Sequence, residues 1–462
     1  MHKKQIRPLA RLHGLWLSRR TLAPMQTWTV EQRRAWIFDQ LKRTLVQADR
    51  GIGFYRDRFR QGGFEPERDF KSVADLARVP VLTKSDVRAG FDQMWDRRFA
   101  LGSVEAHTSG TTGQPMTMRL NERHVAFDYA CMFRHWRKAG YRFRAPSAAI
   151  RSYVPDAADG PLWKYNWWQN TLYMSAYHLK PSTADRYLET LLRFRPQYLR
   201  GYVSSIHLLA QYALPQRERF DFVRGVFTAS ETLSSVERAD IERTFGKKLY
   251  DWYGMTEPAV VITERADHDG LDINWEYGYP EFVEARGLDA GQCKLLATSL
   301  HNPVMPFIRY DTEDIVCLAD GPDSAGLYPK VRAILGRKDE CLVTPDGARL
   351  PTLNFYSLLQ THPAILRFQF VQTASSQVTM KVSLRPGTRD VEAMTAALRG
   401  EVRKRLGPDL VLDIEVTDQF FTSPDGKTPT FKNLIRADTS TAPPLRPAPT
   451  ADAGSSIVNR QS

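Results

Sequence analysis

The feature that most constrains the fold is an alternation of helical segments with short apolar segments in the middle of the chain. Residues 197–202, 223–228 and 248–252 have the composition of buried strands. Between the last two, Ser234 and Glu237 form a capping box, which marks the start of a helix. Buried strands that alternate with helices are typical of α/β proteins, so we predict an α/β sheet here.

Helical spacing of apolar residues also predicts helices over residues 29–50 and 122–138. Two further helices are expected to begin at hydroxyl side chains. We expect Thr183 to cap one of them, and Ser204 with Ser205 to cap another over residues 206–212.

The length and the change of pattern near residue 336 predict more than one domain. A chain of 462 residues exceeds what one hydrophobic core usually serves. After residue 336, short strands surround one helix, a pattern typical of a small α+β domain. We therefore place an N-terminal domain at residues 1–335 and a small C-terminal domain at 336–438. Residues 439–462 are rich in Pro, Ala and Ser, which predicts a disordered tail.

Composition indicates a globular protein and excludes several classes. Apolar residues make up 42% of the chain, and no window approaches the uninterrupted apolar run of a transmembrane segment. A cytoplasmic location is then the default expectation. The four cysteines lie far apart and form no CxxC pair, which argues against a disulfide framework and a structural zinc site.

The chain carries an excess of basic residues, with 64 Lys and Arg against 52 Asp and Glu and a net charge of +12. Such a surplus attracts polyanions in general, whether nucleic acid, an acidic membrane surface or small phosphorylated ligands. Basic residues cluster at residues 399–405 and at the N-terminus, where we expect solvated faces. The N-terminal cluster comprises His2, Lys3, Lys4, Arg7, Arg11, Arg19 and Arg20.

The segment HTSGTTGQP, residues 107–115, combines hydroxyl side chains with glycines. Such a loop can turn backbone N–H groups and hydroxyls toward phosphate oxygens. The alternative is a flexible Ser/Thr/Gly surface loop. The GxxxxGK[ST] pattern is absent, so a P-loop NTPase is not expected.

A second polar segment, YGMTE at residues 253–257, directly follows the predicted strand 248–252. Ligands in open α/β sheets bind at the carboxyl ends of strands. Farther on, residues 311–314 hold three carboxylates between predicted strands at 307–310 and 315–318. An aromatic ring, carboxylates and cations are what a nucleotide with Mg²⁺ needs. The residues that could supply them are Tyr253, Gly254, Glu257, Asp314, Arg337 and Lys427.

Residues 153–177 are unusually rich in aromatic side chains. We expect most of them in the core, with the wall of an apolar ligand pocket as the alternative. The aromatic residues are Tyr153, Trp163, Tyr165, Trp167, Trp168, Tyr173 and Tyr177.

The motifs TSGTTGQP, ASETL, YGMTE, RYDTED, GRKDE and a C-terminal GK, in this order, resemble the adenylate-forming (ANL) superfamily. VPVLTKSDVR and GRKDECLVTPDGARLPTLNFYSLLQ are similar to the phenylacetate-coenzyme A ligase family, especially its CapK-like members associated with capsular polysaccharide loci. The resemblance covers about residues 29–436. It implies a large multi-sheet α/β adenylation domain, and a small mobile α+β lid domain that rotates about Asp339.

The resemblance also implies roles for individual residues. Ser109, Gly110, Thr111, Thr112 and Gly113 would hold the ATP phosphates, Ser230 and Glu231 would line the adenine site, and Tyr253, next to Gly254, would stack on the base. Thr256 would contact the α-phosphate, Glu257 would bind Mg²⁺, Asp314 would take the ribose hydroxyls, and Arg337 would lie near ribose and phosphate. Lys427 would reach the α-phosphate and the substrate carboxylate.

Two departures from the superfamily pattern stand out. Met116 follows Pro115 where many members have lysine, so one phosphate contact is missing or replaced. Asp311 and Glu313 stand in RYDTED where YRTGD is common, which adds acids near an anionic ligand and leaves the shape of the loop open.

The function implied is an ATP- and Mg²⁺-dependent ligase that adenylates an organic carboxylate and passes the acyl group to a thiol, with coenzyme A as the expected acceptor. The aromatic segment, with residues 202–206, would form the acyl pocket and favours an aromatic or otherwise apolar acid. One alternative is transfer to an amine, giving an amide conjugate in polysaccharide or secondary-metabolite biosynthesis. Another is a non-catalytic or nucleic-acid-binding protein on the same fold, although Lys427 and Glu257 weigh against it.

Overall fold

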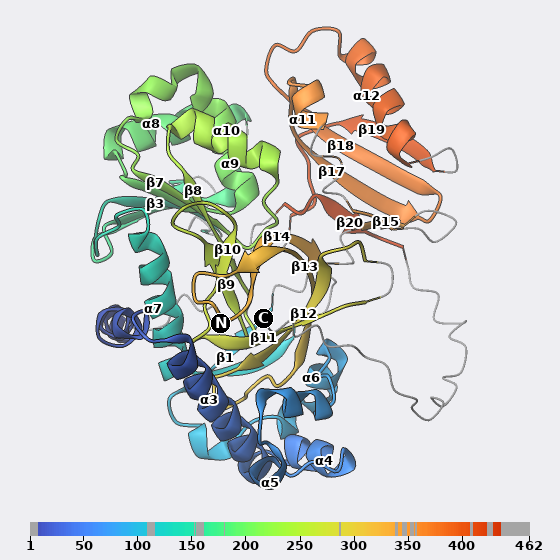
Figure 1. The fold of residues 1–462 in the computed structure, drawn as a ribbon. Coiled ribbons are helices and arrows are strands. Elements are labelled where there is room, and N and C mark those ends of the chain that lie inside the picture. The colour runs from blue at the N-terminus through green and yellow to red at the C-terminus, as the bar shows by residue number, and fades with distance from the viewer. Residues whose placement is uncertain are drawn as a thin grey trace.

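The chain folds into a large part built around a twelve-stranded sheet and a smaller part built around a four-stranded sheet (Figure 1). The computed structural model describes residues 8–108, 116–151, 153, 161–179, 181–285, 288–337, 341–343, 349–351, 355, 358–406, 410–422 and 428–435.

The helices and strands have the following bounds. The α-helices are α1 Pro8–Leu17, α2 Ala23–Met25, α3 Val30–Gly51, α4 Gly53–Gln61, α5 Pro66–Asp69, α6 Lys84–Gly90, α7 Glu122–Arg137, α8 Ala184–Phe194, α9 Val203–Ala213, α10 Ser235–Phe245, α11 Leu358–Thr361 and α12 Val391–Leu406, and a π-helical turn, Ser18–Leu22, joins α1 to α2. The strands of the first half are β1 Ser103–His107, β2 Thr117–Asn121, β3 Ser147–Arg151, β4 Trp163–Asn166, β5 Thr171–Ser175, β6 Tyr198–Gly201, β7 Gly225–Ala229, β8 Leu249–Gly254, β9 Val261–Glu264 and β10 Leu271–Ile273. The remaining strands are β11 Gly278–Val283, β12 Gln292–Ser299, β13 Tyr310–Pro322, β14 Pro329–Arg337, β15 Cys341–Val343, β16 Arg349–Pro351, β17 Ile365–Ala374, β18 Gln377–Leu384, β19 Val411–Val416 and β20 Phe431–Asn433.

The large sheet has the order β11-β12-β13-β14-β10-β9-β8-β7-β6-β3-β5-β4. Strands β5, β3, β6, β7 and β8 run parallel to their neighbours within this set, which confirms the predicted α/β class. The small sheet, β19-β18-β17-β20, is accompanied by α12, and this α+β pattern is also confirmed. The exact domain boundary at 335/336 stays a prediction, since residues 338–340 lie outside the described residues.

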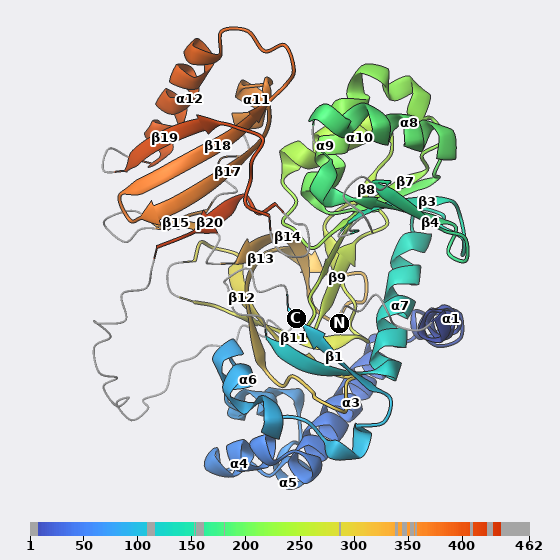
Figure 2. The same cartoon turned by 180° about the vertical axis from the view of Figure 1, so that it is seen from behind.

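Successive residues of the parallel strands pack on opposite faces of the sheet, as the two-residue period of a strand requires. Helices α8, α9 and α10 cover one face and α7 covers the other (Figures 1 and 2). Leu199, Val226 and Leu249 contribute to the first cluster, and Tyr198, Phe227 and Tyr250 to the second. Each buried side chain of this size contributes about 1.5–3 kcal/mol, so both layers stabilise the sheet.

Two of the predicted helix starts are confirmed, and a third differs in its capping. Thr29 begins α3 in a capping box with Gln32, and Ser234 begins α10 in a capping box with Glu237. Thr183 does precede α8, but its side chain accepts no capping hydrogen bond. Its hydroxyl donates to the carbonyl of His178 instead, and its backbone lacks the extended conformation that capping needs.

The acidic run 311–314 does not form a loop between two strands, as the sequence suggested. It lies within one long strand, β13, which begins only at Tyr310. The pairing register of β13 shifts against both β12 and β14, and Glu313 adopts a left-handed φ of +63°. Such irregularities absorb extra residues without ending a strand, which is why the polar run was mistaken for a loop.

The aromatic segment is not uniformly core, which corrects the sequence-based expectation. Tyr165 and Trp167 are exposed, with Trp167 70% accessible to solvent. Tyr165 lies on β4, the outermost strand of the large sheet, and Trp167 lies in the turn that follows it, so both are at the periphery of the sheet. Trp163, on the same strand, is half-buried against the cluster that includes Tyr187.

The N-terminal basic cluster is not uniformly solvated either. Arg11 is buried, lies over the rings of Tyr129 and Phe133, and donates to the side-chain oxygen of Gln169. Arg19 and Arg20 are exposed as expected, and residues 1–7 lie outside the described residues. None of the described helices is long and apolar enough to cross a membrane.

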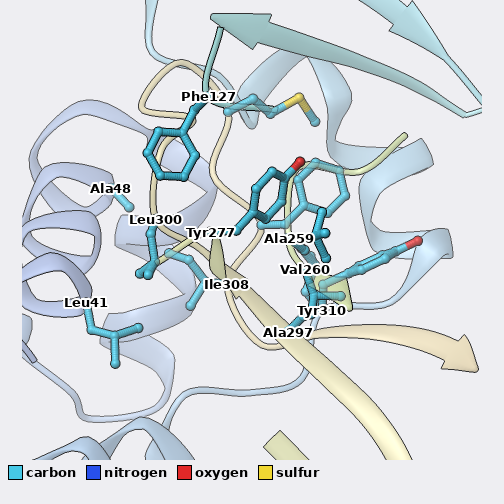
Figure 3. Close-up of a cluster of buried hydrophobic side chains, with 14 of the residues drawn as sticks. Leu41, Ala48, Phe127, Ala259, Val260, Tyr277, Ala297, Leu300, Ile308 and Tyr310 are labelled. Atoms are coloured by element: carbon cyan, nitrogen blue, oxygen red, sulfur yellow. The ribbon is translucent and has the colours of Figure 1, made fainter. Parts of the chain in front are cut away.

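The N-terminal helices share the largest core with the strands that follow the parallel set. Leu41 and Ala48 of α3 lie in one cluster with Phe127, Leu300 and Tyr310 (Figure 3). The cluster also includes Ala259 and Val260, in the connection between β8 and β9. This core therefore holds the segment that follows YGMTE.

Gly278 on β11 allows the close approach of that connection. A Cβ atom at this position would lie 1.7 Å from the carbonyl oxygen of Ala259 and 3.2 Å from that of Thr298. Both obstacles are backbone atoms, which cannot rotate away. Only glycine fits here without displacing the connection.

We expect Gly278→Ala to lower the free energy of unfolding by about 1–3 kcal/mol, the usual cost of overpacking. Urea denaturation of the purified variant measures this. Gly53→Ala is the matched control, because a Cβ there meets no atom within 4 Å. Equal stability of Gly278→Ala and the parent chain would contradict the close approach.

Asp251 is a buried carboxyl on β8, beneath the sheet edge at which YGMTE begins. Burial raises its pKa to about 7, although the hydroxyl of Thr228 donates to its Oδ1 at 2.6 Å. The folded protein therefore keeps this proton in a range where the unfolded chain, with an ordinary pKa near about 3.9, has lost it. Stability from this group is present at low pH and is lost as the pH rises through about 7.

We expect the unfolding free energy to fall between about pH 4 and about pH 7 by up to about 1.4 kcal/mol per pH unit from Asp251 alone. Asp251→Asn should flatten this decline, because the amide stays neutral and its oxygen still accepts from Thr228. Urea unfolding at several pH values measures it, with exposed Asp57→Asn as control. An unchanged slope in Asp251→Asn would refute the raised pKa.

Candidate functional site

The carboxyl ends of four neighbouring parallel strands bring separate sequence segments to one edge of the large sheet. Strand β3 pairs with β6, β6 with β7, and β7 with β8, and Ala229 lies opposite Trp252. The segments that begin at Ser230 and at Tyr253 therefore leave the sheet at the same edge. This is where open α/β sheets bind ligands.

Ser230 and Glu231 follow β7 through a sharp change of direction. Ser230 adopts a φ of +74°, which turns the chain away from the strand. The carboxylate of Glu231 accepts hydrogen bonds from the backbone N–H of Ser204, at 2.7 Å, and from its hydroxyl, at 3.1 Å. Glu231 thus satisfies an N–H at the beginning of α9 and ties this helix to the end of β7.

This bond corrects the predicted helix start at Ser204 and Ser205. Helix α9 begins at Val203, with Tyr202 as its N-cap residue, so both serines lie inside its first turn. A carboxylate from another element supplies the capping oxygen that the local sequence was expected to provide. Sequence reasoning could not foresee it, because Glu231 is 27 residues away.

Tyr253 and Asp314 connect the end of β8 to β13. The Tyr253 hydroxyl donates to Oδ2 of the buried Asp314 at 2.6 Å, and Asp314 pairs in register with Arg337 of β14. Three segments that lie far apart in the sequence therefore meet at one place. The ring of Tyr253 and the carboxylate of Asp314 hold each other in orientation.

Gly254 and Thr256 lie between Tyr253 and Glu257. A Cβ atom at Gly254 would come within 2.5 Å of the indole nitrogen of Trp252, so the side chain of Trp252 occupies the space beside this glycine. Thr256 is half-buried in the connection to β9.

Glu257 is buried, and its Oε1 accepts a hydrogen bond from the hydroxyl of Tyr310 at 2.8 Å. Tyr310 is the first residue of β13 and has its ring in the core, beside Ala259 and Val260 (Figure 3). Sequence reasoning missed Tyr310 because nothing local distinguishes it from a core tyrosine. Its place in RYDTED was the available signal.

The two additional acids of RYDTED each have a lysine partner. Asp311 pairs with Lys294 of β12, with Nζ and Oδ2 3.3 Å apart, and Glu313 forms an ion pair with Lys84. Asp311 also accepts the backbone N–H of Glu313 at 2.9 Å, which stabilises the left-handed turn there. The lysines offset the extra negative charge near an anionic ligand.

The segment VPVLTKSDVR, in which the sequence showed no chemistry, positions β13. The N–H of Leu82 donates to the carbonyl of Arg309 at 3.0 Å, and the N–H of Asp311 donates to the carbonyl of Leu82 at 2.9 Å. Lys84 then follows and binds Glu313. This segment therefore fixes the start of β13 and the residue that holds Glu257.

The loop of residues 109–115 lies outside the described residues, but its two ends are described. It joins β1 to β2, an antiparallel pair, and Thr108 bonds to Met116 through both backbone and side chain. Met116 is buried in the large core, so its side chain contacts apolar groups. The phosphate contact of a lysine at this position is therefore absent rather than replaced by methionine.

The remaining predicted site residues are not described. Ser109, Gly110, Thr111, Thr112, Gly113, Asp339 and Lys427 lie outside the described residues. Within the described part of the chain, no group of three or more His, Cys, Asp or Glu side chains could hold a metal ion. The roles assigned to individual residues stay predictions.

Curated proteins that are similar to this chain include CapK and phenylacetate-coenzyme A ligases. Protein CapK of Staphylococcus aureus is 25% identical over 368 residues, which cover 77% of this chain and 80% of that protein. Phenylacetate-coenzyme A ligase of Escherichia coli K12 is 27% identical over 336 residues, covering 70% of this chain and 75% of that protein. The chain matches no protein-family model.

Solved structures share the fold. A 2-hydroxyisobutyryl-CoA ligase in its postadenylation state, with an acyl-AMP bound, superposes with a TM-score of 0.68 at 19% identity, over 89% of this chain and 91% of that one. The same enzyme in its thioesterification state, with an acyl-AMP and CoA, gives 0.55 at 20% identity, over 89% and 92%. In sequence the chain is thus similar to CapK and to phenylacetate-coenzyme A ligases, and it shares the fold of this acyl-CoA ligase.

Proposed function

We propose that this protein is an ATP-dependent ligase that adenylates an organic carboxylate and transfers the acyl group to coenzyme A. The observation that carries the proposal is the meeting of Tyr253, Asp314 and the Glu257–Tyr310 pair at the carboxyl edge of the parallel strands. Together these residues place an aromatic ring, a carboxylate that can accept hydrogen bonds from hydroxyl groups, and a second carboxylate close to one another.

In the first half-reaction, a carboxylate oxygen attacks the α-phosphorus of ATP. An acyl–oxygen–phosphorus bond forms, the bond to the β-phosphate oxygen breaks, and pyrophosphate leaves with the bonding electrons. Negative charge grows on oxygens that are already anionic, so catalysis consists mainly of positioning and charge neutralisation. We assign these tasks to Lys427 and to the hydroxyls and backbone N–H groups of residues 109–113.

In the second half-reaction, the coenzyme A thiolate attacks the acyl carbonyl. A thioester bond forms and AMP leaves with the electrons of the carbon–oxygen bond. No protein nucleophile is needed in either half-reaction. Rotation of the small domain about Asp339 would remove Lys427 and open a path for the thiol.

The residues present fit a Mg²⁺ ion that is held largely by the nucleotide. Mg²⁺ commonly uses one or two protein carboxylates and takes its other ligands from phosphates and water. Glu257 supplies such a carboxylate, and Tyr310 fixes its orientation from behind. When bound, the ion would neutralise charge on the phosphate groups.

We further propose an aromatic or otherwise apolar acid as the substrate. Tyr202 is buried at the carboxyl end of β6, beside the edge at which Ser230 and Tyr253 lie. The guanidinium of Arg151, at the end of β3, lies over the ring of Tyr202, 5.4 Å from its centroid. An apolar ring with a cation beside it suits an acid whose carboxylate must be turned toward ATP.

The central prediction is acid-dependent release of pyrophosphate. With ATP, Mg²⁺, hydroxylamine as acyl trap and a panel of carboxylates, at least one aromatic or apolar acid should give release well above background. Lys427→Ala should lower the rate by at least about a hundredfold, because it removes a charge that acts in the transition state. The matched control is Lys432→Ala, a lysine in β20 of the same domain.

If no acid stimulates release, or if Lys427→Ala is as active as Lys432→Ala, adenylation is wrong. Once an acid is found, coenzyme A and a set of amines are compared as acceptors. Faster AMP release with amines than with coenzyme A would show that the acyl acceptor is an amine and not a thiol. Salt-sensitive retention on DNA without turnover would favour a binding protein.

A second prediction concerns Tyr310 as a positioning residue. Tyr310→Phe removes the hydrogen bond to Glu257, so we expect a higher Mg²⁺ concentration for half-maximal activity, by about tenfold or more, given a bond to a charged group of about 1.5 kcal/mol or more. Magnesium titration of pyrophosphate release measures it.

Tyr55→Phe is the control, since its buried hydroxyl bonds to backbone groups of Pro306 and Ile308 and, within the described residues, to no carboxylate. Both variants should lose stability, but only Tyr310→Phe should shift the magnesium dependence. An equal magnesium dependence in both variants would show that Tyr310 has a purely structural role.

A further inference from the structure

Helix α1 is attached to the rest of the molecule by one face. Ala10, Gly14 and Ser18 are buried, and a Cβ atom at Gly14 would lie 2.5 Å from Cβ of Tyr129 on α7. The hydroxyl of Ser18 accepts a hydrogen bond from Arg137 of α7. This close packing fixes which side of α1 faces outward.

The outward face of α1 carries large apolar side chains. Leu9, Leu12 and Trp16 are 71%, 43% and 57% exposed, and their spacing places them on one side of the helix. Figures 1 and 2 show α1 at the outer edge of the large part, against α7. These side chains lie outside the site described above.

Arginines continue this face toward the C-terminal end of the helical run. Arg19 and Arg20 are exposed in the π-helical turn, and neither forms an ion pair within the described part of the chain. We call Leu9, Leu12, Trp16, Arg19 and Arg20 the outer face of α1. It has the composition of an amphipathic helix that lies in a lipid interface, with leucine and tryptophan inserted and arginine at the headgroups.

The surface beside the outer face of α1 also combines an exposed tryptophan with arginine. Arg11 bonds to Gln169, in the turn between β4 and β5 that also holds the exposed Trp167. Exposed Arg144 donates to the carbonyl of Trp167 at 3.2 Å. A second exposed tryptophan, again next to an arginine, thus lies on a segment that contacts α1.

Charge favours an anionic lipid surface as the partner of the outer face of α1, over a second copy of the chain and over nucleic acid. A second copy of the chain would bring its own Arg19 and Arg20 to a symmetric contact, and each copy carries a net charge of +12. Nucleic acid would match the arginines but offers no apolar layer for Leu9, Leu12 and Trp16. A lipid headgroup layer over acyl chains satisfies both kinds of side chain.

We propose that the outer face of α1 docks the protein on an anionic membrane surface. The apolar side chains enter the boundary between headgroups and acyl chains, and Arg19 and Arg20 contact lipid phosphates. The candidate site at the edge of the sheet is formed by other elements, β7, β8 and β13.

The test is co-sedimentation of the full chain with vesicles of phosphatidylcholine alone, and of phosphatidylcholine mixed with phosphatidylglycerol. The parent chain should bind the mixed vesicles and not the neutral ones. Leu12→Gln with Trp16→Gln should weaken binding by at least about tenfold, through lost insertion. Arg19→Gln with Arg20→Gln should weaken it by roughly fivefold per arginine.

Two controls match these variants. Leu101→Gln changes a leucine that is 96% exposed but lies outside α1, and Arg60→Gln with Arg403→Gln removes two exposed charges elsewhere. Both should bind as the parent does. Thermal unfolding confirms that each variant is folded, and pyrophosphate release is followed separately because docking does not depend on it.

Any of four results would overturn the proposal. The first is no preference for the anionic vesicles, and the second is equal binding by the Leu12/Trp16 variant and Leu101→Gln. The third is a lipid-free dimer that the Leu12/Trp16 variant converts to monomer, since a second copy would then cover the face. The fourth is retention of DNA that depends on Arg19 and Arg20 but not on Leu12 and Trp16, since nucleic acid and not lipid would then be the ligand of this face.

Discussion

Two hydroxyl–carboxylate hydrogen bonds connect the end of β8 to β13, and the candidate site depends on them. Tyr253 of β8 donates to Asp314 of β13, while Tyr310 of β13 donates to Glu257 beyond β8. A buried carboxylate without a partner is costly, so each bond holds its acid in one orientation. Because the two donors come from opposite segments, neither segment can shift without breaking a bond.

Neighbouring segments hold this connection in place and supply lysines that offset its negative charge. Leu82 bonds to the backbone on both sides of Tyr310, and Gly278 lets the connection after Glu257 approach β11. Lys84 and Lys294 offset the acids that distinguish RYDTED from the commoner form of the motif. The negative charge that Asp311 and Glu313 add to this motif is thus compensated by lysines from other segments.

Local rules predicted the elements well, and long-range contacts account for the errors. The helix start at Thr29 and the capping box of Ser234 with Glu237 depend on residues close together in the sequence, and the structure confirms both. The sequence also predicted the α/β class and the small α+β part. It failed at Ser204, where the capping oxygen comes from Glu231, and at Trp167, which is exposed in the turn after the edge strand β4. For the site, the order of motifs indicated which segments meet, but Tyr310, Leu82 and Lys84 could be assigned only after β13 was placed.

We propose that the edge formed by β7, β8 and β13 positions ATP for attack by a carboxylate. Exchange of labelled pyrophosphate into ATP, with the acid present and every acyl acceptor left out, measures this step alone. We expect exchange that requires the acid and that is lost in the double variant Tyr253→Phe, Asp314→Asn. Exchange without acid, or undiminished exchange in this variant, would show that this edge does not form the adenylation site.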